Sequence, residues 1–230
     1  MDKFFLSIVV SFLLSSNVFA VSGVADKYEV TMNKVELCTT SACSSPTTVA
    51  SGTQSVNIAS LDAGAEASKF GSTSGLPIGT TFSHLRVTLN RAFTIEGEVN
   101  VAGNNWCSTD SASAGTATAL HTGTLDTDGT PTDGTDQTLY LSDADDYGSD
   151  NSITIAYSSP SSAVSMSVGS PSASEVQLIY KLGTDYTVGL VAPKIKITFD
   201  VSTALGAGID GGNNCLLWPE EPVVTISLTE

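Results

Sequence analysis

Alternating apolar and polar residues, in a chain poor in helix-forming residues, limit this protein to a β fold. The pattern is clearest at 194–201, where apolar residues alternate with Lys196, Thr198 and Asp200. A period of two places the apolar residues on one face of a strand and the polar residues on the other. The same period predicts strands at 28–32, 85–89, 176–180 and 224–228.

Shorter runs extend this pattern over most of the chain. Ser, Thr, Gly, Val and Asp dominate them, whereas residues that favour exposed helix faces are scarce. Only Leu61–Phe70 has a helical composition, enough for one or two turns. The shorter runs predict strands at 55–59, 92–101, 116–125, 138–141, 153–157 and 163–168.

Segments rich in Gly, Pro, Asp and Ser separate these strands, as at 126–136 with its two Asp-Gly steps. Short strands at this spacing predict an all-β protein, an antiparallel β-sandwich with long loops. Within the first strand the apolar phase slips by one residue between Met32 and Val35. A β-bulge near Asn33–Lys34 would return both apolar sets to one face of the sheet.

The first twenty residues have the layout of a secretory signal peptide. Lys3 precedes an apolar run from Phe4 to Leu14, and the small-residue ending Val-Phe-Ala follows. The apolar run is shorter than the roughly 20 residues that a transmembrane helix needs. We therefore expect residues 1–20 to be removed and residues 21–230 to form a single β-sandwich domain without a transmembrane segment.

The formal charge of −15 is unevenly distributed. No Lys or Arg lies between Arg91 and Lys181, and most of the excess negative charge falls in this interval. Such a chain repels polyanions, which argues against nucleic acid and anionic membranes as partners, and it attracts cations. The charge would also keep an exported protein soluble. The acidic residues of the interval are Glu96, Glu98, Asp110, Asp126, Asp128, Asp133, Asp136, Asp143, Asp145, Asp146, Asp150 and Glu175.

Four cysteines in an exported chain are expected to pair as disulfides. Cys38 and Cys43 are five residues apart, a spacing that suits the closure of a loop at a strand end. Cys107 and Cys215 then remain for each other, and both follow Asn-rich turns. Three pairings exist in principle, and we favour Cys38–Cys43 with Cys107–Cys215. These spacings match a zinc site poorly.

The acidic stretch 126–150 is the best candidate for a metal site, because Ca²⁺ prefers carboxylate and carbonyl oxygens on a flexible loop. Asp143, Asp145 and Asp150 have a suitable spacing, although the closing Glu of an EF-hand is missing. Our hypothesis is that these three residues help to hold calcium, while no cofactor is otherwise required. The alternative is a solvated acidic loop.

No catalytic residues are expected, because the sequence motifs of the common enzyme classes are missing. His84 and His121 are the only histidines, and His84 is expected on the outer face of its strand, together with Phe82 and Arg86. No Gly-x-Ser-x-Gly elbow, His-Glu-x-x-His pair or phosphate-binding loop occurs. We therefore expect a protein that is not an enzyme.

Trp106 and Trp218 are the only tryptophans, and each lies within three residues of a cysteine. A Trp beside a disulfide usually packs against it, as in many sandwich domains. The alternative is that an exposed indole stacks on a sugar. That alternative would require an aromatic platform near the acidic stretch.

Part of the chain resembles a known type of domain. The strand Tyr28-Glu-Val-Thr-Met-Asn-Lys-Val-Glu-Leu37, the short strand 55–58 and the segment Leu76-Pro-Ile-Gly-Thr-Thr-Phe-Ser-His-Leu-Arg-Val-Thr-Leu89 are similar to transthyretin-like or immunoglobulin-like sandwich domains of bacterial envelope proteins. The resemblance covers residues 25–100, and it implies a fold and a surface location rather than an activity. For the chain as a whole, a jelly-roll-like sandwich is the alternative topology.

Together these observations predict a non-enzymatic structural or interaction protein that is secreted or held at the cell surface, with the periplasm as a further location. Such a protein could form part of an extracellular fibre or matrix, because both terminal segments, 21–32 and 223–228, read as strands that could complete a neighbour's sheet. The alternative is a calcium-assisted carbohydrate-binding module or adhesin, whose partners would be surface glycans.

Overall fold

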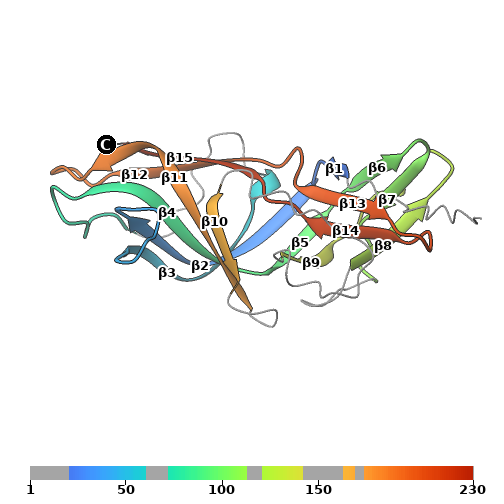
Figure 1. Cartoon of the computed structure of the whole chain (residues 1–230), viewed down its shortest axis with the longest axis horizontal. Helices are drawn as coiled ribbons and strands as arrows, with labels where there is room; N and C mark the ends of the chain where they lie inside the picture. The colour runs from blue at the N-terminus through green and yellow to red at the C-terminus, as the bar shows by residue number, and fades with distance from the viewer. Residues whose placement is uncertain (1–20, 61–71, 113–120, 142–162, 169–173, 230) are drawn as a thin grey trace, which may run out of the picture.

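Strands form nearly all of the regular structure in the computed structural model, which describes residues 21–60, 72–112, 121–141, 163–168 and 174–229 (Figure 1). The fifteen strands there pair antiparallel throughout, and one short 3-10 helix, η1 (Ile58–Ser60), follows the third strand. The predicted all-β antiparallel architecture is confirmed.

A seven-stranded sheet forms the floor of the sandwich. Its central strands are long and carry alternating buried residues, as the apolar period predicts. The order is β10 (Ala163–Val168), β11 (Glu175–Thr187), β4 (Thr81–Asn90), β2 (Lys27–Cys38), β5 (Ala92–Glu96) and β9 (Gln137–Tyr140), and β3 (Thr47–Asn57) also pairs with β2.

A two-stranded sheet, which we call the roof of the sandwich, packs over one end of this floor. It consists of β12 (Lys194–Asp200) and β15 (Val223–Thr229), which pair along their whole length. β15 runs close to β11 (Figure 1). Ile226 of β15 is buried, whereas Ile195, Ile197 and Phe199 of β12 are only partly buried.

The other end of the molecule is a six-stranded sheet that curves back on itself. Gly23 and Val99, which belong to its two edge strands, come into contact, since a Cβ atom on Gly23 would lie 3.0 Å from Val99 Cγ2. The order is β1 (Val21–Gly23), β13 (Leu205–Ile209), β14 (Cys215–Pro219), β8 (His121–Asp126), β7 (Asn105–Ser108) and β6 (Glu98–Ala102).

The two ends are joined by a chain crossing at Gly97 and share one contiguous core. A single predicted strand at 92–101 is in fact two, β5 and β6, because Gly97 carries the chain from one sheet to the other. A Cβ atom on Gly97 would lie 2.9 Å from the carbonyl oxygen of Val24. Thr109 fixes this crossing, since its hydroxyl accepts a hydrogen bond of 3.1 Å from the Gly97 amide.

The local predictions for the first strands have mixed outcomes. The β-bulge near Asn33–Lys34 is confirmed, because the register of β2 shifts between Met32 and Lys34 against both neighbouring strands. Phe82, expected on the outer face of its strand, is instead 1% exposed. The cause is a second register shift, between Lys181 and Tyr186 of β11, which breaks the alternation opposite this residue.

Both favoured disulfides are confirmed. Cys38–Cys43 closes the loop after β2, and Cys107–Cys215 joins β7 to β14 across the intervening strand β8. Gly123 of β8 lies under the second bridge, where a Cβ atom would stand 2.3 Å from the Ser108 carbonyl oxygen and 3.3 Å from Cys215 Sγ. Glycine is therefore required at this position chiefly by the close approach of the Ser108 backbone and Leu217.

Some predicted segments lie outside the described residues. These are the signal peptide at 1–20, the helical segment at 61–70, the strand at 153–157 and the first part of the strand at 116–125. Within the described ranges, no helix has both the length and the apolar character needed to span a membrane.

Candidate functional site

The proposed calcium ligands Asp143, Asp145 and Asp150 lie outside the described residues. The neighbouring acidic residues Asp126 and Asp128 are described, and their carboxylates close a turn. Asp126 accepts hydrogen bonds from the Thr132 amide (2.8 Å) and hydroxyl (3.2 Å), and Asp128 accepts one from the Thr130 amide. In the described part of the chain, no three His, Cys, Asp or Glu residues are grouped closely enough to hold a metal ion.

A row of three outward-facing residues crosses the six-stranded sheet beside this turn. Trp106 on β7 lies directly opposite Asn100 on β6 and Asp126 on β8. Residues directly opposite in antiparallel strands have their side chains on the same face. The flanking Val99 and Cys107 are buried, so the row faces outward, and Trp106 is partly exposed. We call these three residues the Trp106 row.

The two tryptophans have different environments, and the expected packing against a disulfide does not describe either. Trp106 is next to Cys107 in the same strand, so the two side chains point to opposite faces. Trp218 is 1% exposed, and its indole lies over Gly206 on the neighbouring strand, where a Cβ atom would stand 2.1 Å from Nε1. Its Nε1–H donates to Glu220 Oε1 at 2.7 Å.

At the opposite end of the molecule, two loops present exposed apolar side chains. Leu190 is 92% exposed, Ile78 67% and Val191 56%. Two backbone hydrogen bonds hold the loops together, from Gly79 N to Val188 O (2.8 Å) and from Val188 N to Thr80 O (2.9 Å). We call Ile78, Leu190 and Val191 the apolar tip; it lies at the left end in Figure 1.

Sequence reasoning missed the apolar tip. The available signal is the segment Gly189-Leu-Val-Ala-Pro193, in which apolar residues occupy a turn bounded by Gly and Pro. Turn residues face solvent unless another element covers them. Apolar side chains there have no role in the sandwich core, so a turn of this composition predicts a contact surface.

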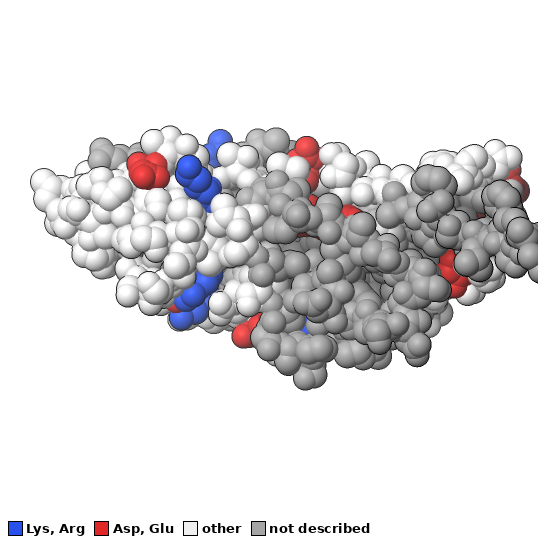
Figure 2. Space-filling view, viewed as in Figure 1, with Lys and Arg blue, Asp and Glu red and all other residues white. Residues whose placement is uncertain are grey.

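The basic side chains are unevenly distributed along the molecule, whereas acidic side chains occur over its whole length. On the face shown in Figure 2, the Lys and Arg side chains lie over the floor and roof of the sandwich, whereas the coloured atoms at the β6–β7–β8 end include acidic side chains and no basic ones. The acidic residues there disfavour further negative charge. Burial, followed by the charges of Asp26, Asp133 and Glu96, raises the pKa of Glu98.

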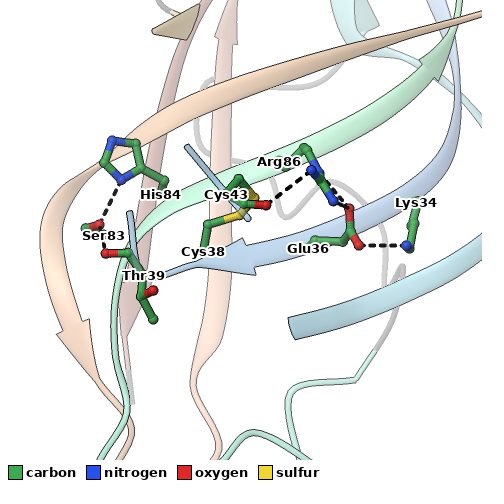
Figure 3. Close-up of a disulfide and its surroundings, with 8 residues drawn as sticks. All are labelled: Lys34, Glu36, Cys38, Thr39, Cys43, Ser83, His84 and Arg86. Atoms are coloured by element: carbon green, nitrogen blue, oxygen red, sulfur yellow. Dashed lines mark hydrogen bonds and ion pairs between the residues drawn. A yellow bond between two sulfur atoms is a disulfide. The ribbon is translucent and has the colours of Figure 1, made fainter. Parts of the chain in front are cut away.

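An ion-pair network centred on the buried Glu36 lies beside the Cys38–Cys43 disulfide (Figure 3). Glu36 accepts from Arg86 Nε and pairs with Lys34 Nζ, and Arg86 also donates to the Cys43 carbonyl oxygen. Burial alone would raise the pKa of Glu36, but the hydrogen bonds and charges of Lys34 and Arg86 outweigh it, so the pKa lies below the usual range. All three charges are used within the network, which fixes the loop and offers no free charge for a ligand.

The two terminal strands are paired within the chain. β1 is hydrogen-bonded to β13, and β15 to β12. Either strand would have to leave its own partner in order to complete a neighbour's sheet, and β15 would also remove Ile226 from the core.

No family model matches the chain, and no curated protein or solved structure matches it either.

Proposed function

We propose that this protein is an exported, non-enzymatic structural or interaction protein of the cell surface or extracellular matrix, and that the apolar tip is its contact surface. The exposed apolar tip is the observation that carries the proposal. Two disulfides indicate an oxidising compartment, which agrees with export. Surface apolar residues are common singly, but three together on paired loops are typical of an interaction site.

The occupant that we propose for the apolar tip is a second copy of the chain. Two copies of a protein with a charge of −15 repel each other. A tip-to-tip contact places the acidic ends of the two molecules as far apart as their length allows. Such a contact is isologous and closes as a dimer, so a fibre would need a further contact between dimers.

Light scattering coupled to size exclusion tests this proposal on the mature protein, residues 21–230. We expect a concentration-dependent dimer that Leu190→Ser together with Val191→Ser converts to a monomer. Val164→Ser, at a residue 50% exposed on β10, is the matched control and should leave the dimer intact. A wild-type protein that stays monomeric at every concentration would overturn the proposal that a second copy of the chain binds the apolar tip.

A second candidate function, binding of surface glycans as a carbohydrate-binding module or adhesin, is supported by the Trp106 row. The partly exposed Trp106 indole offers an apolar face for stacking. The Asn100 amide and the Asp126 carboxylate lie beside it, and each is also hydrogen-bonded within its own turn. Calcium assistance would depend on Asp143, Asp145 and Asp150, which are close in sequence to the Asp126 turn.

Glycan-array binding separates this candidate from the first. Wild-type protein should bind a defined set of glycans, Trp106→Ala should abolish binding, and Trp106→Phe should retain part of it because a ring still stacks. Repeating the assay with calcium and with EDTA tests the metal. Equal binding by wild type and Trp106→Ala would exclude the Trp106 row as the site.

A further inference from the structure

The outward face that carries the Trp106 row has a second row of polar residues beside it. Glu98 of β6 lies directly opposite Ser108 of β7, which in turn lies opposite Thr124 of β8. Each of these residues is two positions along its strand from its counterpart in the Trp106 row, so the two rows share one face of the sheet. The face therefore presents an indole with a carboxylate on each neighbouring strand, Glu98 on one side and Asp126 on the other.

The negative charge of these two carboxylates is not neutralised within the described part of the chain. Neither Glu98 nor Asp126 takes part in the ion pairs found there. Asp126 accepts hydrogen bonds from the Thr132 amide and hydroxyl, but these donors are neutral and leave its charge in place. Burial and the neighbouring carboxylates raise the pKa of Glu98. A positively charged group at this face would relieve the repulsion.

A buried hydroxyl on the strand between the two carboxylates has no partner. Ser108 is 0% exposed, and its Oγ makes no hydrogen bond to any described residue. A buried polar atom without a hydrogen bond is costly, and such atoms are rare in native proteins. A donor group that reaches Oγ from the outward face would satisfy it.

The Trp106 indole adds a preference for the shape of the ligand. It is partly exposed, and the face of an indole attracts both apolar surface and a cation. A sugar ring with a free amine combines the features that this face selects. The ring stacks on Trp106, the ammonium group lies against Asp126, and an N–H group is available for Ser108.

We propose that this face selects amino sugars whose amine is free over sugars that are N-acetylated or carboxylated. An N-acetyl group removes the positive charge of the amine, and a carboxylate is repelled by Glu98 and Asp126. This selectivity rests on the second candidate function, glycan binding at the Trp106 row, and adds to it the class of sugar.

Titration calorimetry of the mature protein with a glucosamine trimer and with an N-acetylglucosamine trimer measures the selectivity. We expect the glucosamine trimer to bind at least about tenfold more tightly, a difference of one decade in Kd. Asp126→Asn should remove most of this preference. Asp185→Asn is the matched control, because it removes the same charge from an exposed position on β11 and should leave the preference unchanged. Trp106→Ala should abolish the binding of both trimers.

Equal binding of the two trimers by the wild type would overturn the selectivity and leave glycan binding itself standing. An unchanged preference in folded Asp126→Asn would overturn it as well. Glucosamine binding that persists in Trp106→Ala would mean that net charge alone attracts the amine. If neither trimer binds, the face does not select amino sugars, and the glycan array decides whether the second candidate function fails too. Thermal unfolding shows whether each variant is folded, and Glu98→Gln replaces Asp126→Asn if the latter does not fold.

Discussion

At the scale of single residues, Gly123 carries the sharpest steric requirement. The Cys107–Cys215 disulfide crosses its strand, and a methyl group would approach the Ser108 carbonyl oxygen to 2.3 Å and Leu217 Cδ1 to 2.5 Å. Backbone cannot move out of the way as a flexible side chain can. The β8 strand must therefore have glycine at this position.

We expect Gly123→Ala to lower the free energy of unfolding by about 1–3 kcal/mol, the range of overpacking in a filled core. Gly211→Ala is the matched control, since a methyl group there meets no atom within 4 Å. Urea unfolding of both variants measures the difference. Equal stability of the two variants would show that β8 does not pack against Ser108 and Leu217 as described.

His121 is a buried titratable residue that makes the stability depend on pH. The residue is 1% exposed, Nδ1 has no hydrogen-bond partner among the described residues, and Nε2 accepts from the Tyr140 amide at 3.3 Å. Burial lowers the pKa of His121 to about 4. The unfolded chain takes up a proton near pH 6.5 and the folded chain only near pH 4, so acidification between these values favours unfolding.

From this shift we expect the free energy of unfolding to fall by about 2 kcal/mol between pH 7 and pH 5 through His121 alone. His121→Phe keeps an aromatic ring beside Tyr140 and should remove that part of the pH dependence. His84→Gln, which leaves His121 in place, should keep it. Urea unfolding at the two pH values provides the measurement. If the free energy of unfolding of His121→Phe fell as much between pH 7 and pH 5 as that of the wild type, His121 would not be the source of the pH dependence.

At the scale of elements, the two disulfides differ in the length of chain that they close. Cys107–Cys215 spans 108 residues, whereas Cys38–Cys43 spans five. In the chain-entropy account, a bridge stabilises by restricting the unfolded chain, and the effect grows with the logarithm of the loop length.

Replacing both cysteines of each bridge by alanine should therefore give unequal losses. We expect about 5 kcal/mol for the Cys107–Cys215 pair and about 2 kcal/mol for the Cys38–Cys43 pair. Denaturant unfolding without reductant compares the two double variants directly. A larger loss for the short loop would mean that its network with Arg86 and Glu36, rather than chain entropy, dominates.

The elements that could be predicted from the sequence are those with a local signal. The alternation of apolar and polar residues predicted β2, β4, β11, β12 and β15, and the slip in that alternation between Met32 and Val35 predicted the bulge in β2. The split at Gly97 and the burial of Phe82 could not be predicted, because both depend on which strand lies alongside. The resemblance of residues 25–100 to transthyretin-like or immunoglobulin-like domains stays a prediction.

The candidate sites were less predictable than the strands. Trp106 and Asp126 are twenty residues apart in sequence, and only the pairing of β7 with β8 brings them together. The apolar tip likewise depends on two loops that are more than a hundred residues apart. Contacts of this kind depend on topology, which a local pattern does not encode.

At the scale of the whole molecule, the apolar tip lies at one end of an elongated sandwich, and the β6–β7–β8 strands, where the charged side chains in view are acidic, lie at the other (Figures 1 and 2). Association through the apolar tip would work against the repulsion between two negatively charged copies. Salt screens that repulsion over a Debye length of about 8 Å at physiological ionic strength, and it leaves an apolar contact intact. Self-association should therefore strengthen as salt is added, the opposite of an association driven by salt bridges.

Sedimentation equilibrium of residues 21–230 at low and high NaCl, with the Leu190→Ser and Val191→Ser double variant alongside, tests the central claim most directly. The account predicts a dimer whose Kd falls as NaCl rises, and a double variant that remains monomeric at both concentrations. A dimer that weakens with salt, or one that the double variant forms equally well, would contradict it.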